Sequence, residues 1–370
     1  MKIVICGGGV IGCTLAYYLV HSDDFGEHDE VIVVEEVGVA AAASGKAGGF
    51  LASNWCQGED INGLCQLSFR LHEELARVAD GTTIYDYRRV DTISCVVTTK
   101  PSKSRKLHTD NIVPAWVRGH VVESHAIGDK ATCAQVHPRK FTETMLRLAM
   151  ATGKARLVHG AVSGLLHGPQ RGVVVDGMTI EADAVVLAMG PWTFPCLTQW
   201  LEFPSIAPPE VYKIHSVVLE SARTAAFDPI VVFGELKESH NDVEIVPRPD
   251  GSVYACGPRD AEPLPASASL VLPTAARVAE LIAGVAAFDG AAAESEVVAK
   301  QACYLPSTKD NIPVVGRVQD GIYVAAGHGC WGVLNAPATA LALSQLVLTG
   351  HTTCVDLSPF APARYTMTFD

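Results

Sequence analysis

The chain has 370 residues, of which 48% are hydrophobic, and carries a formal net charge of −12 at pH 7. This size and composition suit two domains with sizeable cores, and the negative charge argues against nucleic acid or an anionic membrane as the main partner. Eleven cysteines without a C-x-x-C pair indicate reduced thiols, so we expect neither a disulfide framework nor a metal site. Because the first apolar run starts at Lys2 or Ile3, we expect no leader peptide and a cytoplasmic location.

The chain opens with the pattern of a dinucleotide-binding βαβ unit. The apolar run Lys2–Cys6 leads into the turn Gly7-x-Gly9-x-x-Gly12, an apolar helical pattern follows, and a second apolar run ends at Glu35. Glycines in such a turn let the backbone approach a pyrophosphate at the N-terminus of the helix. Glu35 can accept hydrogen bonds from a ribose diol and would repel a 2′-phosphate, so the motif favours FAD or NAD over NADP.

Small residues dominate the segment after Glu35. The run 40–49 consists mainly of alanine and glycine around Ser44 and Lys46. Small side chains let the backbone lie against a flat ligand, and glycine adopts backbone angles that other residues avoid. We interpret this segment as a contact to the cofactor, and the alternative is a flexible loop.

The remaining pattern alternates between helices and strands. Apolar residues at helical spacing predict helices at 64–78, 140–151 and 274–287. A polar and basic stretch at 99–110 predicts an exposed loop. Apolar or alternating runs rich in β-branched residues predict strands at 84–98, 155–162, 173–175, 213–220, 230–233, 243–246 and 253–256.

Two further apolar runs end in glycine. The run 184–188 precedes Gly190, and the run 321–326 precedes a glycine-rich turn at 327–332 and a long apolar stretch. A parallel sheet presents such glycines to a ligand at the carboxyl ends of its strands. The apolar stretch 333–349 contains Pro337 and is short for a bilayer, so it predicts a buried helix and no membrane span.

The nucleotide-binding pattern thus recurs at both ends of the chain and in its middle. We predict an α/β protein whose Rossmann-like dinucleotide-binding domain is discontinuous and comprises 1–85, 136–195 and 300–370. The segments 86–135 and 196–299 are predicted to form a strand-rich α+β substrate domain.

These landmarks resemble the D-amino-acid oxidase-like family of FAD-dependent oxidoreductases, which includes glycine oxidase and sarcosine oxidase. The resemblance runs from Met1 to about Gly350 and rests on the first glycine turn, Glu35, the segments 43–49 and 188–192, the pattern Pro306-x-x-x-Asp310-x-x-Pro313 with Gly316, and the segment 327–337. More narrowly, the stretches 303–306 and 327–337 are similar to a poorly characterised branch of yeast and plant oxidoreductases.

The resemblance implies FAD, bound in an extended form with its ring between the two domains. The helix after the 327–332 turn would direct its N-terminus at the ring and stabilise the negative charge of the reduced form. The implied cofactor contacts are Gly7, Gly9, Val10, Ile11, Gly12, Glu35, Glu36, Ser44, Gly45, Lys46, Gly48, Gly49, Val162, Ala188, Gly190, Trp192, Cys303, Gly327, His328, Gly329, Trp331 and Gly332.

Two side chains of the last turn are also candidates for the chemistry. His328 could donate a hydrogen bond to the flavin or move a substrate proton near neutral pH, and the alternative is that it holds the turn in shape. Trp331 could form one wall of the substrate pocket or pack beneath the flavin ring. The absence of an obvious acid–base pair is no objection, because flavin-dependent amine oxidation depends mainly on positioning.

The position that contacts the substrate carboxylate in the family differs in this chain. Glycine oxidase-like members have an arginine immediately before the proline of the Pro306 motif, whereas this chain has Leu305, which cannot pair with a carboxylate. Lys213 or Arg259 could take over that role, as could His215 or Arg248. For each of them the alternative is a solvated surface charge.

Two further positions bear on the flavin and its electron acceptor. Cys303 has the spacing before Asp310 at which sarcosine oxidases bond a cysteine covalently to the flavin, and the alternative is a buried strand cysteine. The stretch 252–257, where sarcosine oxidases carry an oxygen-activating lysine, contains none.

We therefore expect an FAD-dependent oxidoreductase that oxidises a C–N bond of a small amine or amino acid to an imine, with oxygen as the acceptor and hydrogen peroxide as a product. The alternatives are a flavin dehydrogenase with another acceptor, a flavin-binding protein with a mainly regulatory or scaffolding role, and an NAD-dependent dehydrogenase. The oligomeric state is left open.

Overall fold

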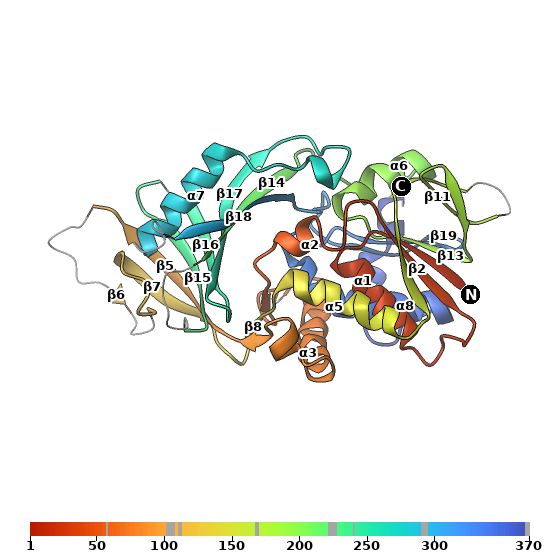
Figure 1. Ribbon diagram of the computed structural model, residues 1–370, viewed down its shortest axis with the longest axis horizontal. Coiled ribbons are helices and arrows are strands. Elements are labelled where there is room, and N and C mark those ends of the chain that lie inside the picture. The colour runs from red at the N-terminus through yellow and green to blue at the C-terminus, as the bar shows by residue number, and fades with distance from the viewer. Residues whose placement is uncertain are drawn as a thin grey trace.

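The computed structural model describes residues 1–56, 58–100, 108–109, 113–166, 170–220, 228–239, 241–289 and 295–366. Two large sheets lie side by side, each with helices on an outer face (Figure 1). The loop predicted at 99–110 falls largely outside the described residues. Within it, however, His108–Thr109 forms a short strand, β6, beside β7.

The first sheet has six strands in the order β19-β20-β13-β1-β2-β9. All neighbours are parallel except β19, which runs antiparallel to β20 at one edge. The strands come from both ends and the middle of the chain: β1 (Lys2–Cys6), β2 (Glu30–Glu35), β9 (Ala155–His159), β13 (Ala184–Leu187), β19 (Val314–Gln319) and β20 (Ile322–Ala326).

Both faces of this sheet are covered, which explains why its strands read as continuous apolar runs. Ile3 and Ile5 of β1 face a core shared with the helices, whereas Val4 faces a second core on the opposite side. The first face is covered by α1 (Val10–Val20), α3 (Asn62–Val78), α5 (Pro138–Ala151) and α8 (Gly332–Thr349). The second is covered by the meander β10 (Val162–Leu165), β11 (Gly172–Val175) and β12 (Met178–Glu181), and by α6 (Thr193–Leu201).

The second sheet has eight strands in the order β18-β14-β17-β16-β15-β5-β7-β6. One face packs on α7 (Ala275–Phe288), and the other faces the first sheet and its loops (Figure 1). Its remaining strands are β5 (Asp91–Thr98), β7 (His120–Gly128), β14 (Tyr212–Glu220), β15 (Ile230–Leu236), β16 (Asn241–Pro247), β17 (Ser252–Ala261) and β18 (Glu296–Tyr304).

Short elements fill the junction between the two sheets. A three-stranded sheet joins β3 (Phe50–Ala52), β8 (Cys133–Gln135) and β4 (Arg88–Arg89), and the short helices α2 (Ala43–Lys46) and α4 (Gly81–Ile84) lie nearby in sequence. Single turns of 3-10 helix occur at η1 (Gly190–Trp192), η2 (Ala268–Leu270), η4 (Gly329–Trp331), η5 (Ser358–Phe360) and η6 (Pro362–Tyr365).

The structure corrects two expectations about local elements. The single strand predicted at 155–162 is two strands in different sheets, because β9 ends at His159 and β10 begins after a turn. The strand predicted at 84–98 is also divided, because Ile84 ends α4, Arg88–Arg89 forms β4 of the three-stranded sheet, and β5 begins only at Asp91.

The long apolar helix is buried for a reason other than length. The segment Gly329–Thr349 has 21 residues and a mean hydropathy of 1.3, so by length and composition it could cross a membrane. The expectation that it is too short was wrong. However, 67% of its most apolar window is buried within the protein, where α8 packs against α1 and α3. These are the features of a core helix.

The predicted domain boundaries stay a prediction. Strands β5 and β7 join β14 to β17 in the eight-stranded sheet, and β18 runs through the boundary placed at residue 300.

His72 makes the stability of the helical core dependent on pH. Its side chain is fully buried on α3, and its Nε2–H donates to the Val333 carbonyl of α8 at 2.9 Å, while its Nδ1 has no hydrogen-bond partner. Burial lowers the pKa of His72 from 6.5 to about 4. The unfolded chain therefore binds a proton that the folded chain excludes, and the contribution of His72 is complete above pH 6.5 and is lost as the pH falls towards 4.

We expect the contribution of His72 to lower the free energy of unfolding by about 1.5 kcal/mol between pH 6.5 and pH 5. Urea titrations of His72→Gln should show a weaker pH dependence than the wild type over this range. His159→Gln, at an exposed position of β9, is the control. Equal slopes for His72→Gln and the wild type would contradict the assignment.

Candidate functional site

A cavity of about 330 Å³ lies between the glycine turns of the first sheet and the inner face of the second. It is lined from the first side by the loops that follow β1, β2, β13 and β20, and from the second by side chains of β14, β16, β17 and β18. The predicted residues that line it are Gly7, Gly9, Val10, Ile11, Ser44, Lys46, Gly48, Ala188, Gly190, Trp192, Cys303, Gly327, His328, Gly329 and Gly332.

The first glycine turn has the geometry that the motif requires. Gly7 has a φ of +113°, and a Cβ there would lie 2.4 Å from the Ala188 carbonyl oxygen. A Cβ at Gly12 would lie 2.1 Å from the carbonyl oxygen of Gly7. Helix α1 therefore packs against the end of β1 more closely than any side chain allows, and its N-terminus opens into the cavity.

Ser44 connects the alanine-rich segment to this helix. Its Oγ accepts a hydrogen bond from the Val10 N–H at 2.8 Å, and a Cβ at Gly9 would lie 3.1 Å from the same oxygen. The segment 40–49 is thus a structured wall of the cavity, in agreement with its interpretation as a contact surface. Gly45 packs against the backbone oxygen of Ala40, and Gly49 packs against that of Val136. Both glycines lie outside the cavity lining.

Glu35 stands at the end of β2, next to the glycine turn. Its carboxylate accepts hydrogen bonds from the N–H groups of Gly8 at 2.7 Å, Val37 at 3.0 Å and Gly38 at 3.2 Å. A carboxylate offers about four acceptor positions, so one remains for a ribose hydroxyl. Glu36 is exposed. Like Val162 on β10, it lies outside the cavity lining.

His328 holds the second glycine turn in place. It is buried, and its Nε2 lies 3.0 Å from the Thr339 hydroxyl within α8. Burial lowers the pKa of His328 to about 4, so the ring is neutral at physiological pH and cannot donate a proton as an imidazolium. His328 lines the cavity, and its contact with Thr339 positions the N-terminus of α8. Trp331 lies outside the lining and packs edge-to-face on Trp55, with ring centroids 6.0 Å apart.

The structure places the two predicted cationic candidates away from the cavity. Lys213 is buried and donates to Glu262 at 2.7 Å, and the guanidinium of Arg259 lies over the Tyr212 ring at 5.0 Å. Lys213 lies on the face of β14 opposite the cavity-lining Ile214, whereas Arg259 on β17 is the direct cross-strand neighbour of Ile214. Both lie outside the cavity lining, and their role stays a prediction. His215 is also engaged, because its Nε2 accepts from the Thr274 N–H at 3.0 Å.

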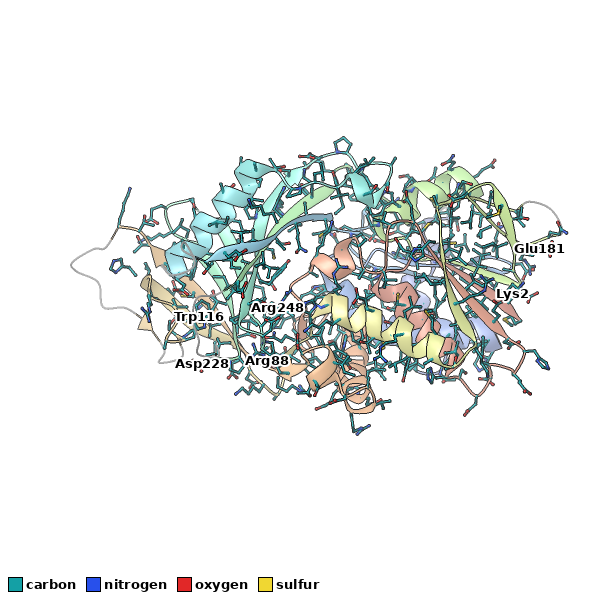
Figure 2. All side chains as sticks on the ribbon, viewed as in Figure 1. Lys2, Arg88, Trp116, Glu181, Asp228 and Arg248 are labelled. Carbon is teal, nitrogen blue, oxygen red and sulfur yellow. The ribbon has the colours of Figure 1, made fainter. Side chains whose placement is uncertain are left out.

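Arg248, the fourth cationic candidate, lies outside the cavity lining. It is buried near Arg88 at one end of the second sheet (Figure 2). Its guanidinium lies 5.4 Å from the ring centroid of Tyr254, which itself lines the cavity.

Sequence reasoning missed the polar face of the second sheet. Glu244, Tyr254 and Cys256 line the cavity from β16 and β17, and the Cys256 thiol donates to the Glu244 carboxylate at 3.5 Å. Burial raises the pKa of Glu244 to about 7. The sequence Val243-Glu244-Ile245 could have indicated this position of Glu244. Its two apolar side chains face the core, so the carboxylate between them lies on the opposite face of the strand.

The site fits FAD. Glycines let the backbone approach a pyrophosphate at the N-terminus of α1, and the N-terminus of α8 opens into the same cavity. Glu35 lies outside the cavity lining but is held next to the glycine turn by the Gly8 N–H. Small residues at 40–43 line the space between the two helix N-termini. Together these features define a dinucleotide-binding protein of the α/β class.

Residues 2–346 match the family model described as "DAO: FAD dependent oxidoreductase", and the chain belongs to this family. A Schizosaccharomyces pombe protein named as an oxidoreductase, C1F5.03c, is 32% identical and aligns over 98% of this chain and 97% of its own length. The structure of glycine oxidase from Geobacillus kaustophilus superposes with a TM-score of 0.79 at 21% identity, covering 98% of this chain and 99% of that one. L-proline dehydrogenase from P. horikoshii gives a TM-score of 0.76 at 19% identity and 99% and 97% coverage.

These findings confirm the predicted family, the two-domain α/β fold and FAD as the cofactor. The protein is an FAD-dependent oxidoreductase. The individual contacts to FAD stay a prediction, resting on the geometry above.

We expect Glu35→Gln to lower the affinity for FAD about tenfold or more, because the ribose loses a charged acceptor. Titration of the apoprotein with FAD, followed by flavin fluorescence, measures this. Glu36→Gln, the adjacent exposed carboxylate, should bind as the wild type does. An unchanged affinity in Glu35→Gln would remove Glu35 from the site.

We expect the flavin to be bound without a covalent bond to Cys303. Burial raises the pKa of this thiol to about 11, with Lys46 opposing the shift, so the reactive thiolate is scarce at neutral pH. Acid precipitation of the purified protein should release all yellow colour into the supernatant. Colour that stays with the wild-type pellet and disappears in Cys303→Ala would show the opposite.

Proposed function

We propose that the protein oxidises a C–N bond of a small amine or amino acid, with oxygen as the electron acceptor. The observation that carries this proposal is the cavity itself, in which the N-termini of α1 and α8 meet an inner sheet face that is apolar except for a few polar groups. When bound, FAD supplies an acceptor for the hydride of the carbon next to nitrogen, and the resulting imine hydrolyses while oxygen is reduced to hydrogen peroxide.

The chain's own residues would bind and orient the substrate. Ile214, Leu305 and Met189 give the cavity apolar walls that exclude water, which favours a neutral amine with its C–H bond directed at the acceptor. Tyr254 fixes one wall, because its hydroxyl donates to the Lys46 carbonyl at 2.9 Å. The names of the structural neighbours, an amino acid oxidase and a dehydrogenase, agree with C–N chemistry.

A flavin dehydrogenase with another acceptor is the second candidate. It is favoured by the absence of lysine from the described stretch 252–257 of β17. Lys46 reaches the cavity from α2 instead and is the cation available there for a reaction with oxygen.

We expect the purified protein to be yellow and to bleach under argon when a suitable amine or amino acid is added. Admission of air should restore the colour and release one hydrogen peroxide per substrate if oxygen is the acceptor. Bleaching without recovery in air would identify a dehydrogenase. Bound flavin that no compound of an amine and amino acid panel reduces would contradict the C–N assignment.

A further inference from the structure

We propose that the substrate is an amine without a carboxylate and that Glu244 binds its amino group. This inference rests on the proposed C–N oxidation and names the class of substrate. The observation that supports it is the Glu244 carboxylate on the inner face of the second sheet, which lines the cavity and forms no ion pair with any residue that the structure describes.

Strand register places Glu244 at the cavity. On β16, Val243 and Ile245 face the core under α7, so Glu244 faces the opposite side. Its direct cross-strand neighbour on β17 is Cys256. The carboxylate reaches the segment after α2, because a Cβ at Gly48 would lie 2.9 Å from Oε1.

Glu244 has no counter-ion among the described residues. Within the part of the chain that the structure describes, no Lys, Arg or His nitrogen forms an ion pair with Glu244, and its hydrogen-bond partner is the weak donor of Cys256. Removal from water disfavours the charged form of the Glu244 carboxyl, and a nearby cation favours that form again. A substrate ammonium would supply that cation and two or three N–H donors. Transfer of one proton from nitrogen to the Glu244 carboxylate would then leave the neutral amine that oxidation requires.

The cavity offers little to a carboxylate. Leu305 lines it at the position where the family resemblance implies a carboxylate-binding arginine. Lys46 is the cation among its described lining residues, and its Nζ already donates to the Ala302 carbonyl at 2.9 Å. The guanidinium of Arg248 lies over the Tyr254 ring and that of Arg259 over the Tyr212 ring, and both arginines lie outside the lining. A carboxylate in this space would meet apolar walls and the charge of Glu244, whereas an ammonium would meet a partner.

The first experiment measures binding without turnover. tert-Butylamine and pivalate carry the same tert-butyl group and opposite charges, and tert-butylamine has no hydrogen on the carbon next to nitrogen. We expect tert-butylamine to perturb the flavin absorbance of the holoprotein with at least tenfold lower Kd than pivalate. Glu244→Gln should weaken tert-butylamine binding about tenfold, and Glu220→Gln, an exposed carboxylate on β14 outside the cavity lining, should not.

The second experiment compares substrates that differ only in the carboxylate. Isobutylamine and valine form one pair, and phenethylamine and phenylalanine form another, with both enantiomers of each amino acid. Anaerobic flavin reduction should be faster with the amine of each pair by tenfold or more.

The outcomes separate this proposal from the function on which it rests. Tighter binding of pivalate than of tert-butylamine would overturn the amine assignment. So would faster flavin reduction by the amino acids, if Lys46→Gln or Arg248→Gln abolishes that advantage. Either result would leave C–N oxidation intact. Reduction by neither member of any pair, with no binding of tert-butylamine, would contradict both. Binding of tert-butylamine that is equal in Glu244→Gln and the wild type would remove Glu244 from the site.

Discussion

The close approach of α1 to the end of β1 is the constraint on which the rest of the structure depends. The missing Cβ atoms at Gly7 and Gly12 let the helix begin directly at the carboxyl edge of the sheet. Helix α8 packs alongside α1, and so its N-terminus emerges at the same edge. Two positive helix ends therefore meet in one cavity, which is an arrangement suited to an anionic, electron-accepting cofactor.

Sequence reasoning succeeded where the signal was local. The glycine turn, Glu35 and the alanine-rich segment each combine a motif with a backbone requirement, and the structure puts all three around one site. Apolar runs identified the parallel strands because both faces of that sheet are covered. FAD itself came from the family resemblance, since the glycine turn alone serves NAD equally well.

Sequence reasoning failed where the outcome depends on which face of a strand meets which partner. Lys213 lies on β14, one residue from the cavity-lining Ile214, yet it forms an ion pair with Glu262 on the other side. Glu244 was overlooked because a lone carboxylate in a short strand has no motif. Its importance comes from the segment after α2 that faces it, which is nearly two hundred residues away in sequence.

The contacts of that segment couple the two halves of the molecule. Tyr254 and Ser216, on the second sheet, both donate to the Lys46 carbonyl, at 2.9 Å and 3.3 Å, and Ser44 a turn earlier accepts from the N-terminus of α1. A rearrangement of the alanine-rich segment on FAD binding would therefore be transmitted to the second sheet through these hydrogen bonds. Under the proposed function, FAD and the substrate would then be thermodynamically linked, and each would change the affinity for the other by the same factor.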